Sequence, residues 1–337
     1  MAHVLVTGGN GYIGNILVDQ LLKDEHEVTV VDWMVFGEHP LAGHRGNPKF
    51  RLVRQDIRSL PPRVLSDVDV VCDLAALSND PSGELDVTLT REINYEARAR
   101  LARIAKAVGV KRYLLASSCS VYGVNGGEVA DETSDVRPQT VYAECNVLSE
   151  KALLALSDKD FAVTAFRNAT VFGLSRRMRF DLVINIMTLA ACKNGRLEIH
   201  GDGKQHRPFV HAQDVAAGFC AAIRAPVEKI EGEIFNLGVG NYTVGEIAAM
   251  VKETLPIAIE IDYAPSSADN RDYTVSFDKV KKVLGFEPKV TVREGIIEVF
   301  IALQTGRTHD SFETRTLDVY SALIKADQIG LYSNMAG

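Results

Sequence analysis

The sequence lacks an uninterrupted apolar segment long enough to span a bilayer, so no transmembrane helix is expected. It has only five cysteines in 337 residues, an odd number without C-x-x-C spacing, which excludes a disulfide framework and favours reduced thiols in the cytoplasm. Basic residues are in deficit: 37 Lys and Arg against 44 Asp and Glu give a net charge of -7, which disfavours nucleic acid as a partner. No repeat or low-complexity segment is present, and we expect no metal site.

The length exceeds that of an average domain, so one large or two intimately joined domains are expected. A β-branched run over residues 3–7 predicts a buried strand close to the first residue, which leaves no room for a signal peptide. These features are typical of a soluble cytoplasmic enzyme without a membrane partner.

A glycine-rich turn, Gly8-Gly9-Asn10-Gly11-Tyr12-Ile13-Gly14, follows that strand and precedes an apolar helical pattern. Early glycines allow a tight turn and let backbone N–H groups approach a pyrophosphate, while the last allows close helix packing. The pattern alone is weak evidence, but its place between a strand and a helix is the context that dinucleotide binding requires. The alternative is an ordinary glycine turn.

Asp32 ends a second predicted strand, residues 27–31, about twenty residues after the glycines. A carboxylate at this point can accept hydrogen bonds from the hydroxyls of the adenosine ribose. Trp33 and Met34 follow, and no arginine is placed to bind a 2′-phosphate. We therefore expect NAD rather than NADP.

Strands and helices alternate through the first half, with further strands expected over residues 50–54, 69–74 and 112–116. Such alternation predicts an α/β fold, a doubly wound parallel sheet that binds its ligand at the carboxyl ends of the strands. The residues after each strand are the candidates for cofactor contacts: Asp56 and Ile57 near the adenine, and Leu74, Ala75 and Ala76 beneath the cofactor. The alternative for the alanines is strand-end packing.

Two long helices are expected near residues 84–108 and 139–156, both apolar around much of their circumference. This pattern predicts a homodimer through these helices, with packing inside one chain as the alternative. Later segments interleave with earlier ones. We expect an NAD-binding domain of residues 1–173, to which 206–240 return, and a smaller α+β substrate domain of residues 174–205 and 241–337.

The segment Ser117-Ser118-Cys119-Ser120-Val121-Tyr122-Gly123, with Tyr142 on the next helix, is the second candidate site. A serine at the end of a central strand and a tyrosine on the following helix can converge on one substrate oxygen. The serine holds the oxygen, and the phenolate removes its proton as hydride leaves for nicotinamide.

Together, three motifs resemble the extended short-chain dehydrogenase/reductases, specifically the NAD-dependent nucleotide-sugar epimerases, dehydratases and dehydrogenases related to UDP-glucose 4-epimerase. They are the turn at residues 7–14, Ala116 to Gly123, and Arg207 to His211, and the resemblance covers roughly residues 3 to 300. Residues 170–173, 177–182 and 270–273 look most like a branch that contains GDP-heptose 4-dehydrogenases.

This resemblance implies a role for each matched position. Ser118 and Tyr142 would be the catalytic hydroxyl pair, with Asn146 and Cys119 beside them. The cofactor would contact Gly8, Gly11, Tyr12, Ile13, Gly14, Asp32, Asp56, Ile57, Leu74, Ala75, Ala76, Ser78, Asn94 and Asn168. A nucleotide-diphosphate sugar would contact Ser120, Thr170, Arg179, Arg207 and Arg271, of which Arg207 and Arg271 would clamp the diphosphate. The alternative for these two arginines is a surface position.

One residue departs from the family pattern Y-x-x-x-K: the fourth residue after Tyr142 is Asn146. Asparagine keeps the hydrogen bonding of the expected lysine but lacks its positive charge. At about 6 Å from the Tyr142 phenolate and an effective dielectric near 20, that charge stabilises the phenolate by on the order of 3 kcal/mol. The chain is then a slow natural enzyme, one altered to trap a complex, or a family member that binds without turnover. On this view, Asn146→Lys raises turnover several-fold.

Cys119 and Ser120 occupy positions where dehydratases of the family carry Asp and Glu, so 4,6-dehydration is disfavoured. We expect Cys119 to line the pocket, with a weak proton donor as the alternative. His211 is expected to be structural, in a helix-entry hydrogen bond with Asp214. The predicted function is oxidation of a nucleotide sugar at C4, with epimerisation as the outcome and dehydrogenation as the alternative. A catalytically weak binding protein is the alternative from another class.

Overall fold

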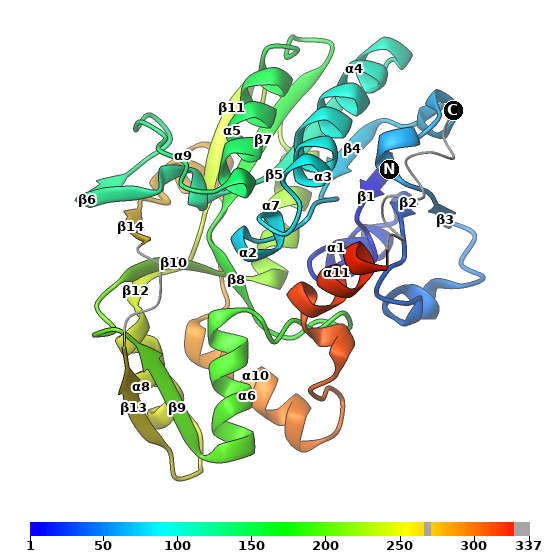
Figure 1. The fold of residues 1–337 in the computed structure, drawn as a ribbon. Helices are drawn as coiled ribbons and strands as arrows, with labels where there is room; N and C mark the ends of the chain where they lie inside the picture. The colour runs from blue at the N-terminus through cyan, green and yellow to red at the C-terminus, as the bar shows by residue number, and fades with distance from the viewer. Residues whose placement is uncertain (266–270, 327–337) are drawn as a thin grey trace.

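The computed structural model describes residues 1–265 and 271–326, and Asn270 of the motif above lies outside them. A seven-stranded sheet in the order β11-β7-β5-β4-β1-β2-β3 forms its centre (Figure 1). The strands are β1 (His3–Thr7), β2 (Glu27–Asp32), β3 (Phe50–Arg54), β4 (Val70–Asp73), β5 (Arg112–Ser118), β7 (Ala162–Asn168) and β11 (Glu233–Leu237). Every neighbouring pair is parallel, so the predicted doubly wound α/β fold is confirmed.

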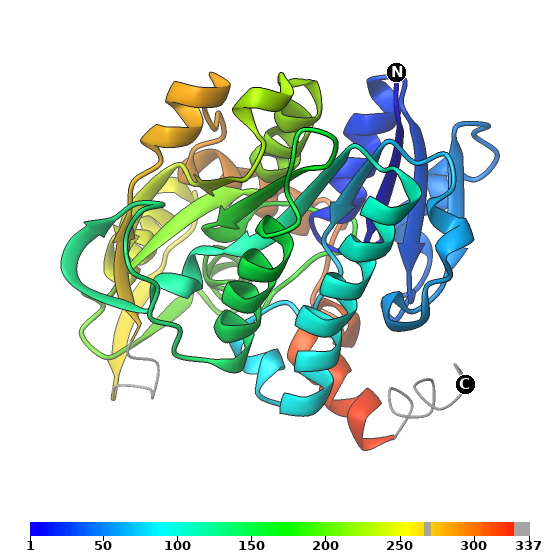
Figure 2. The same ribbon diagram turned by 90° about the horizontal axis from the view of Figure 1, so that it is seen from above.

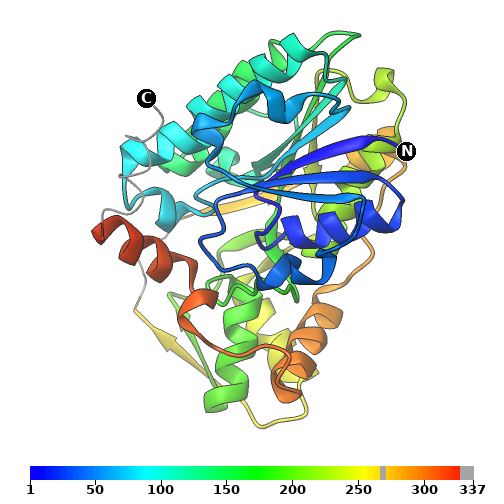
Figure 3. The same ribbon diagram turned by 90° about the vertical axis from the view of Figure 1, so that its right-hand side faces the viewer.

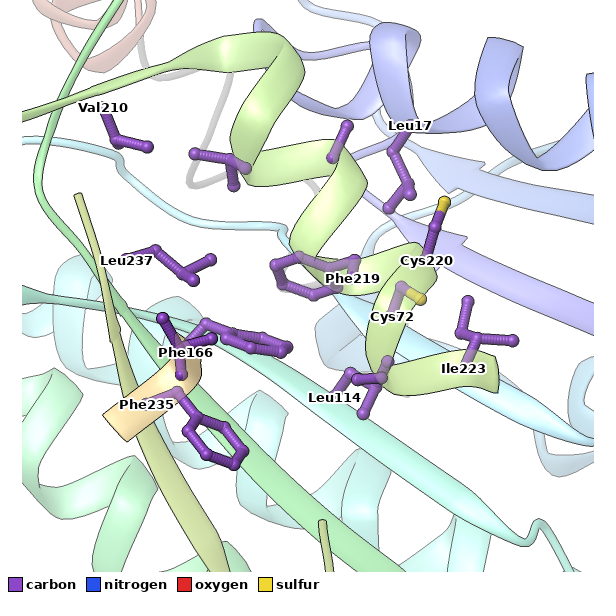
Figure 4. Close-up of a cluster of buried hydrophobic side chains, with 14 of the residues drawn as sticks. Leu17, Cys72, Leu114, Phe166, Val210, Phe219, Cys220, Ile223, Phe235 and Leu237 are labelled. Carbon is purple, nitrogen blue, oxygen red and sulfur yellow. The ribbon is translucent and has the colours of Figure 1, made fainter. Parts of the chain in front are cut away.

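Helices cover both faces of this sheet, as Figure 2 shows from above. One face carries α1 (Gly14–Lys23), α7 (Ala212–Arg224) and α9 (Asp278–Leu284), and the other carries α4 (Arg98–Val108) and α5 (Val141–Leu154). Alternate residues of each strand enter the two layers, as expected when a parallel sheet is buried on both sides: Val4 and Val6 lie in one core, and Leu5 lies in the other. Figure 4 shows the first core, where Leu17 and Phe219 approach Leu114 and Phe166 of the sheet.

The helix expected over residues 84–108 is present from Val87 to Val108, with a π-helical segment inside it. The chain forms α2 (Asp80–Gly83), α3 (Val87–Arg91), a π-helical segment (Glu92–Ala97) and then α4. Asp86 caps α3 by accepting the backbone N–H of Leu89 at 2.9 Å. The π segment widens the helix immediately before Arg98, a geometry that often occurs at functional sites.

The remaining elements form a smaller part beside the carboxyl ends of the large sheet (Figure 1). Its strands are β8 (Thr170–Phe172), β10 (His206–His211) and β12 (Gly240–Thr243) in one sheet, β9 (Arg196–His200) with β13 (Glu260–Ala264), and β6 (Val124–Ala130) with β14 (Asp272–Val275). Its helices are α6 (Val183–Asn194), α8 (Val244–Thr254) and α10 (Val292–Gln304).

The last described helix, α11 (Thr316–Lys325), belongs to the segment 241–337 that was predicted to lie in the substrate domain, but it packs against the large sheet. Val319 and Tyr320 pack into the core formed by Leu5 and Val31 of the large sheet, and Figure 3 shows the helix lying beside that sheet. We retain the two-domain division as a proposal, with α11 placed against the NAD-binding part. None of the helices in the described ranges has the length and apolar character needed to cross a membrane.

Candidate functional site

A cavity of about 750 Å³ runs along the carboxyl ends of the central strands and into the smaller part of the molecule. Most of the predicted site residues line it. They are Gly8, Gly11, Tyr12, Ile13, Gly14, Asp32, Asp56, Ile57, Leu74, Ala75, Ala76, Ser78, Ser118, Ser120, Tyr142, Asn168, Thr170, Arg179, Arg207 and Arg271. Segments far apart in the sequence therefore converge on one space, at the edge where doubly wound folds bind their ligands.

The glycine turn is too tight for side chains at two positions. Gly8 has a φ of +65°, and a Cβ there would lie 2.9 Å from the backbone nitrogen of Ala75. A Cβ at Gly14 would lie 2.2 Å from the carbonyl oxygen of Gly8, so helix α1 begins directly against the turn. The turn thus leaves an open cradle of backbone in front of a helix N-terminus, which fits the diphosphate of a dinucleotide.

Asp32 ends β2 at the rim of this cradle. Its carboxylate accepts the backbone N–H groups of Asn10 at 3.0 Å and Met34 at 2.7 Å. Burial raises the pKa of Asp32, while these two donors and the Arg177 guanidinium counteract the rise. The backbone N–H of Trp33 also bonds this carboxylate, so Asp32 is held in a fixed orientation at the cavity, where it can receive ribose hydroxyls.

Asp56 lies farther along the same wall, at the end of β3. Arg58 donates to its Oδ2 through Nε at 3.0 Å and through Nη2 at 2.7 Å, and the same guanidinium lies over the Trp33 ring at 5.5 Å. This pair fixes the part of the wall where the sequence places the adenine.

Tyr142 and Ser118 come together at the centre of the cavity. Tyr142 lies in the first turn of α5, where Thr140 caps the helix by accepting the N–H of Ala143 at 3.2 Å. Gly83 of α2 packs against this tyrosine, because a Cβ at Gly83 would lie 3.0 Å from the Tyr142 Cβ. The partly buried phenol interacts with the Ser118 hydroxyl, which also accepts the backbone N–H of Ser120 at 3.1 Å.

Several charges act on the Tyr142 phenol. Burial raises its pKa most, and the Asp80 carboxylate on α2 raises it further. The Arg98 guanidinium and the side chains of Asn146 and Ser118 lower the pKa. Tyr142 is therefore a neutral phenol at neutral pH in this arrangement of charges.

Three predicted residues do not line the cavity. The Cys119 thiol turns into the core and donates to the Arg167 carbonyl at 3.1 Å, and burial raises its pKa, so the expected pocket-lining role is wrong. Asn94 lies behind the cavity wall. Its Oδ1 accepts the backbone N–H of Leu77 at 2.9 Å, and its Nδ2 donates to the Leu77 carbonyl at 3.0 Å. Asn146 lies one helical turn below Tyr142 and is 1% exposed. These last two residues act on the cavity only through the groups they hold.

The predicted substrate residues line more than one part of the cavity. Arg271 forms an ion pair with Asp80, and Arg207 donates to the Arg271 carbonyl. Arg179 pairs with Asp181 and donates to the Ser78 carbonyl at 3.0 Å, which joins the two parts of the molecule, and it lies close to Tyr12 of the glycine turn. Thr170 opens β8 on the cavity wall. Arg207 and Arg271 thus lie together, and their guanidinium groups are suited to a diphosphate.

His211 is structural, as predicted, but its partners differ from the prediction. Its Nδ1 accepts the N–H of Gln213 at 3.2 Å, and its Nε2 lies 2.9 Å from Glu298. Asp214 instead accepts the backbone N–H groups of Lys289 at 3.0 Å and Val290 at 2.9 Å. The histidine thus fixes α7 against α10 without touching the cavity.

The cavity is also lined by charged and aromatic residues that the predicted site did not include, among them Asp80, Arg98, Arg177 and Tyr320. Arg177 is 3% exposed and its guanidinium lies 3.6 Å from the centre of the Phe36 ring. Its Nε has no hydrogen-bond partner, no carboxylate in the described ranges forms an ion pair with it, and burial lowers its pKa to about 10. The cluster of arginines at 176–179 was a signal, but it did not distinguish this buried cation from its neighbours.

Comparison with known proteins gives the family. The model of the NAD dependent epimerase/dehydratase family matches residues 4–238. UDP-glucuronic acid decarboxylase 1 of Arabidopsis thaliana is 29% identical over 310 residues, which cover 87% of this chain and 68% of that protein. UDP-glucuronic acid decarboxylase 4 of the same plant is 31% identical over 308 residues, covering 87% and 67%.

Solved structures are similar over nearly the whole chain. MoeE5 in complex with UDP-glucuronic acid and NAD is 28% identical, with a TM-score of 0.78 over 90% of this chain and 99% of that one. UDP-glucuronic acid 4-epimerase from Bacillus cereus, in complex with UDP-glucuronic acid and NAD, has a TM-score of 0.81 at 23% identity, with coverage of 90% and 99%. The second comparison supports the fold alone.

Proposed function

The chain belongs to the NAD dependent epimerase/dehydratase family, and from this premise we propose that it oxidises the sugar of a nucleotide-diphosphate sugar at C4 and that its net reaction is epimerisation. It is an NAD-dependent enzyme of the nucleotide-sugar epimerase, dehydratase and decarboxylase type. One observation carries the proposal: Tyr142 and Ser118 meet in a cavity that also contains the glycine turn and Asp32.

The residues of the cavity fit the cofactor. The turn from Gly8 to Gly14 and the N-terminus of α1 would hold the diphosphate of NAD, and Asp32 would hold its adenosine ribose. NAD supplies the acceptor for the hydride when it is bound. Ala75 and Ala76 have small side chains, which leave room for the cofactor in this part of the cavity. The side-chain nitrogen of Asn168 donates to the Ser117 carbonyl at 3.1 Å and so connects the ends of β7 and β5.

Ser118 and Tyr142 would act on the C4 hydroxyl. The Ser118 hydroxyl is fixed by the N–H of Ser120, so it can hold the substrate oxygen while Tyr142, once ionised to the phenolate, accepts its proton. Loss of that proton accompanies departure of the hydride from C4 and gives a 4-keto sugar. If the keto sugar rotates in the cavity before the hydride and proton return, the hydride reaches the opposite face of C4 and the configuration there is inverted.

Decarboxylation is a second candidate, favoured by the two plant relatives, because a C4 ketone in a uronic acid makes the C6 carboxylate a β-keto acid that loses CO₂. The negative charge of Asp80 disfavours decarboxylation. This carboxylate lines the cavity and acts on Tyr142, so it would repel a second carboxylate beside the reacting carbon. A neutral sugar suits this charge arrangement better.

The test is rapid mixing of the NAD-loaded protein with UDP-glucose, UDP-glucuronic acid, UDP-N-acetylglucosamine and GDP-mannose, followed by the absorbance of reduced nicotinamide. A transient signal and a C4 epimer among the products support the proposal. Stoichiometric reduced NAD indicates dehydrogenation, and release of CO₂ indicates decarboxylation. Tyr142→Phe should abolish the signal, at a cost of about 10²-fold or more in rate, while NAD binding remains. Binding of a sugar nucleotide without any spectral change would indicate a non-catalytic protein.

We also propose a homodimer through α4 and α5. Val108 of α4 is 45% exposed and Leu148 of α5 is 37% exposed, so each helix presents one large apolar side chain to the outside. Analytical ultracentrifugation tests this, and Leu148→Glu should yield a monomer if the surface is the interface.

A further inference from the structure

Arg98 is a buried cation at the back of the cavity, below the proposed catalytic tyrosine. It is 1% exposed and is the first residue of α4, directly after the π-helical segment. Arginine is rarely buried to this extent unless its donors are satisfied and its charge is used or compensated. The surroundings of this side chain therefore require an explanation.

Two groups of β4 and its following loop hold the guanidinium in place. Nε and Nη2 both donate to the Ala75 carbonyl, at 3.2 and 3.0 Å. The Asp73 carboxylate lies 3.9 Å from Nε, and it is itself occupied by the hydroxyls of Thr7 at 2.6 Å and Tyr113 at 2.7 Å. Asp73 is thus a shared, more distant counter-ion, and the Arg98 charge is only partly compensated.

The third nitrogen of the Arg98 guanidinium points toward the catalytic helix. Nη1 donates to Asn146 Oδ1 at 3.3 Å, and Asn146 Nδ2 donates to the Tyr142 carbonyl at 3.2 Å. A guanidinium has donors only, so it fixes which end of the amide faces it. Asn146 is uncharged, and Arg98 is therefore the group that brings a fixed positive charge beneath Tyr142.

We propose that Arg98 is a positioning residue of the C4 oxidation: it orients Asn146 and supplies the fixed positive charge that favours the phenolate of Tyr142. This inference rests on the function proposed above. It assigns the Asp73–Arg98–Asn146 chain to the tuning of the base. The structural alternative is that Arg98 only connects the β4 loop to α5, in which case its charge is immaterial to Tyr142.

The charges that face Tyr142 from the surrounding elements are few. Asp80 of α2 opposes ionisation and is paired with Arg271, and Arg98 of α4 favours ionisation and is accompanied by Asp73 of β4. From β5 the neighbour is the Ser118 hydroxyl, and Arg167 of β7 is neutralised by Glu150 within α5. On α5 itself, Glu144 pairs with Arg91 of α3. Arg98 is the cation in this described set whose removal should act most strongly on the phenol.

The test measures the titration of residue 142 directly. 3-Fluorotyrosine is incorporated at position 142 of the full-length, NAD-saturated protein, because its more acidic phenol titrates within a pH range that the fold tolerates, and the ¹⁹F resonance is followed with pH. Arg98→Gln should move the midpoint to higher pH, and Arg98→Lys should restore it toward the wild-type value. Arg91→Gln, which removes a surface guanidinium paired with Glu144, is the matched control and should leave the midpoint unchanged.

Asp73→Asn provides a second variant should Arg98→Gln fail to fold: removal of the counter-ion should lower the midpoint. The proposal is overturned if Arg98→Gln titrates like the wild type, if Arg98→Lys shifts as far as Arg98→Gln, or if Asp73→Asn leaves the midpoint in place. No substrate enters this experiment, so a negative result leaves the proposed reaction untouched. Failure of the proposed reaction would instead appear as hydride transfer that survives Tyr142→Phe.

Discussion

Replacement of Asn146 by lysine is the substitution for which the sequence alone and the structure predict opposite results. On the sequence alone, Asn146→Lys restores a missing charge and raises turnover. In the structure, Asn146 Oδ1 accepts from Arg98 Nη1 at 3.3 Å, so the new ammonium would lie beside a guanidinium. Two like charges about 4 Å apart at an effective dielectric near 20 repel by about 4 kcal/mol, and a buried hydrogen bond is lost as well. The expected result therefore reverses.

We expect Asn146→Lys to lower the free energy of unfolding by about 2 to 4 kcal/mol and to give no gain in the rate of nicotinamide reduction. Urea unfolding measures the first quantity and rapid mixing the second. The double variant Arg98→Gln with Asn146→Lys exchanges the positions of the two groups and should recover most of the lost stability, a coupling that a double-mutant cycle reports. An Asn146→Lys protein that is as stable as the wild type and turns over several-fold faster would refute the reasoning.

Two further predictions concern other charged groups. Arg177 lines the cavity, its charge acts on Asp32 and its Nε has no partner, so we expect it to donate a charge-assisted hydrogen bond to bound NAD. Arg177→Met should therefore weaken NAD binding by about tenfold or more, whereas Arg176→Met, which removes a more exposed arginine paired with Asp19, should not. Calorimetric titration with NAD measures both, and equal effects would contradict a contact between Arg177 and NAD. Burial opposes ionisation of Glu298, but the hydrogen bonds from His211 and the backbone N–H of Leu174, with the charges of His211 and Arg307, together outweigh it and hold the pKa of Glu298 below 4.5. These interactions stabilise the fold above that pH, and the stabilisation is lost as pH falls through the lower, folded-state value. Glu298→Gln should therefore destabilise the protein at pH 7 more than at about pH 3, and a difference that stays constant with pH would exclude this linkage.

The features that were predicted from the sequence are those set by short-range pattern. The glycine turn between a strand and an amphipathic helix, the alternation that gives the parallel sheet, and Asp32 at a strand end depend on neighbours within about thirty residues. Tyr142 and Ser118 were found because each lies at a fixed place relative to the end of an element. The placement of both in the cavity follows from the parallel order of β5 and β7.

The features that were missed depend on contacts between distant segments. In the sequence, Arg98 resembles any other arginine on a helix. Its role depends on hydrogen bonds to Ala75, 23 residues away, and to Asn146, 48 residues away. Cys119 was placed in the cavity by its neighbours, but it opens a 3₁₀ turn in which Ser118 and Ser120 face the cavity and the thiol faces the core. The π segment within the helix of residues 87–108 aligns Asn94 and Arg98 with the β4 loop, which no helical periodicity reveals.

The most direct test of the proposed C4 oxidation is a kinetic isotope effect on nicotinamide reduction. From the panel above, the nucleotide sugar with the largest signal is prepared with deuterium at C4 and, separately, at C3, and each is mixed rapidly with the NAD-loaded protein. Hydride removal at C4, with Tyr142 as the base, predicts a slower rise of reduced nicotinamide for the C4 label alone. A slower rise with the C3 label instead, or the same rate for both labels in a step shown to be limited by chemistry, would contradict the account.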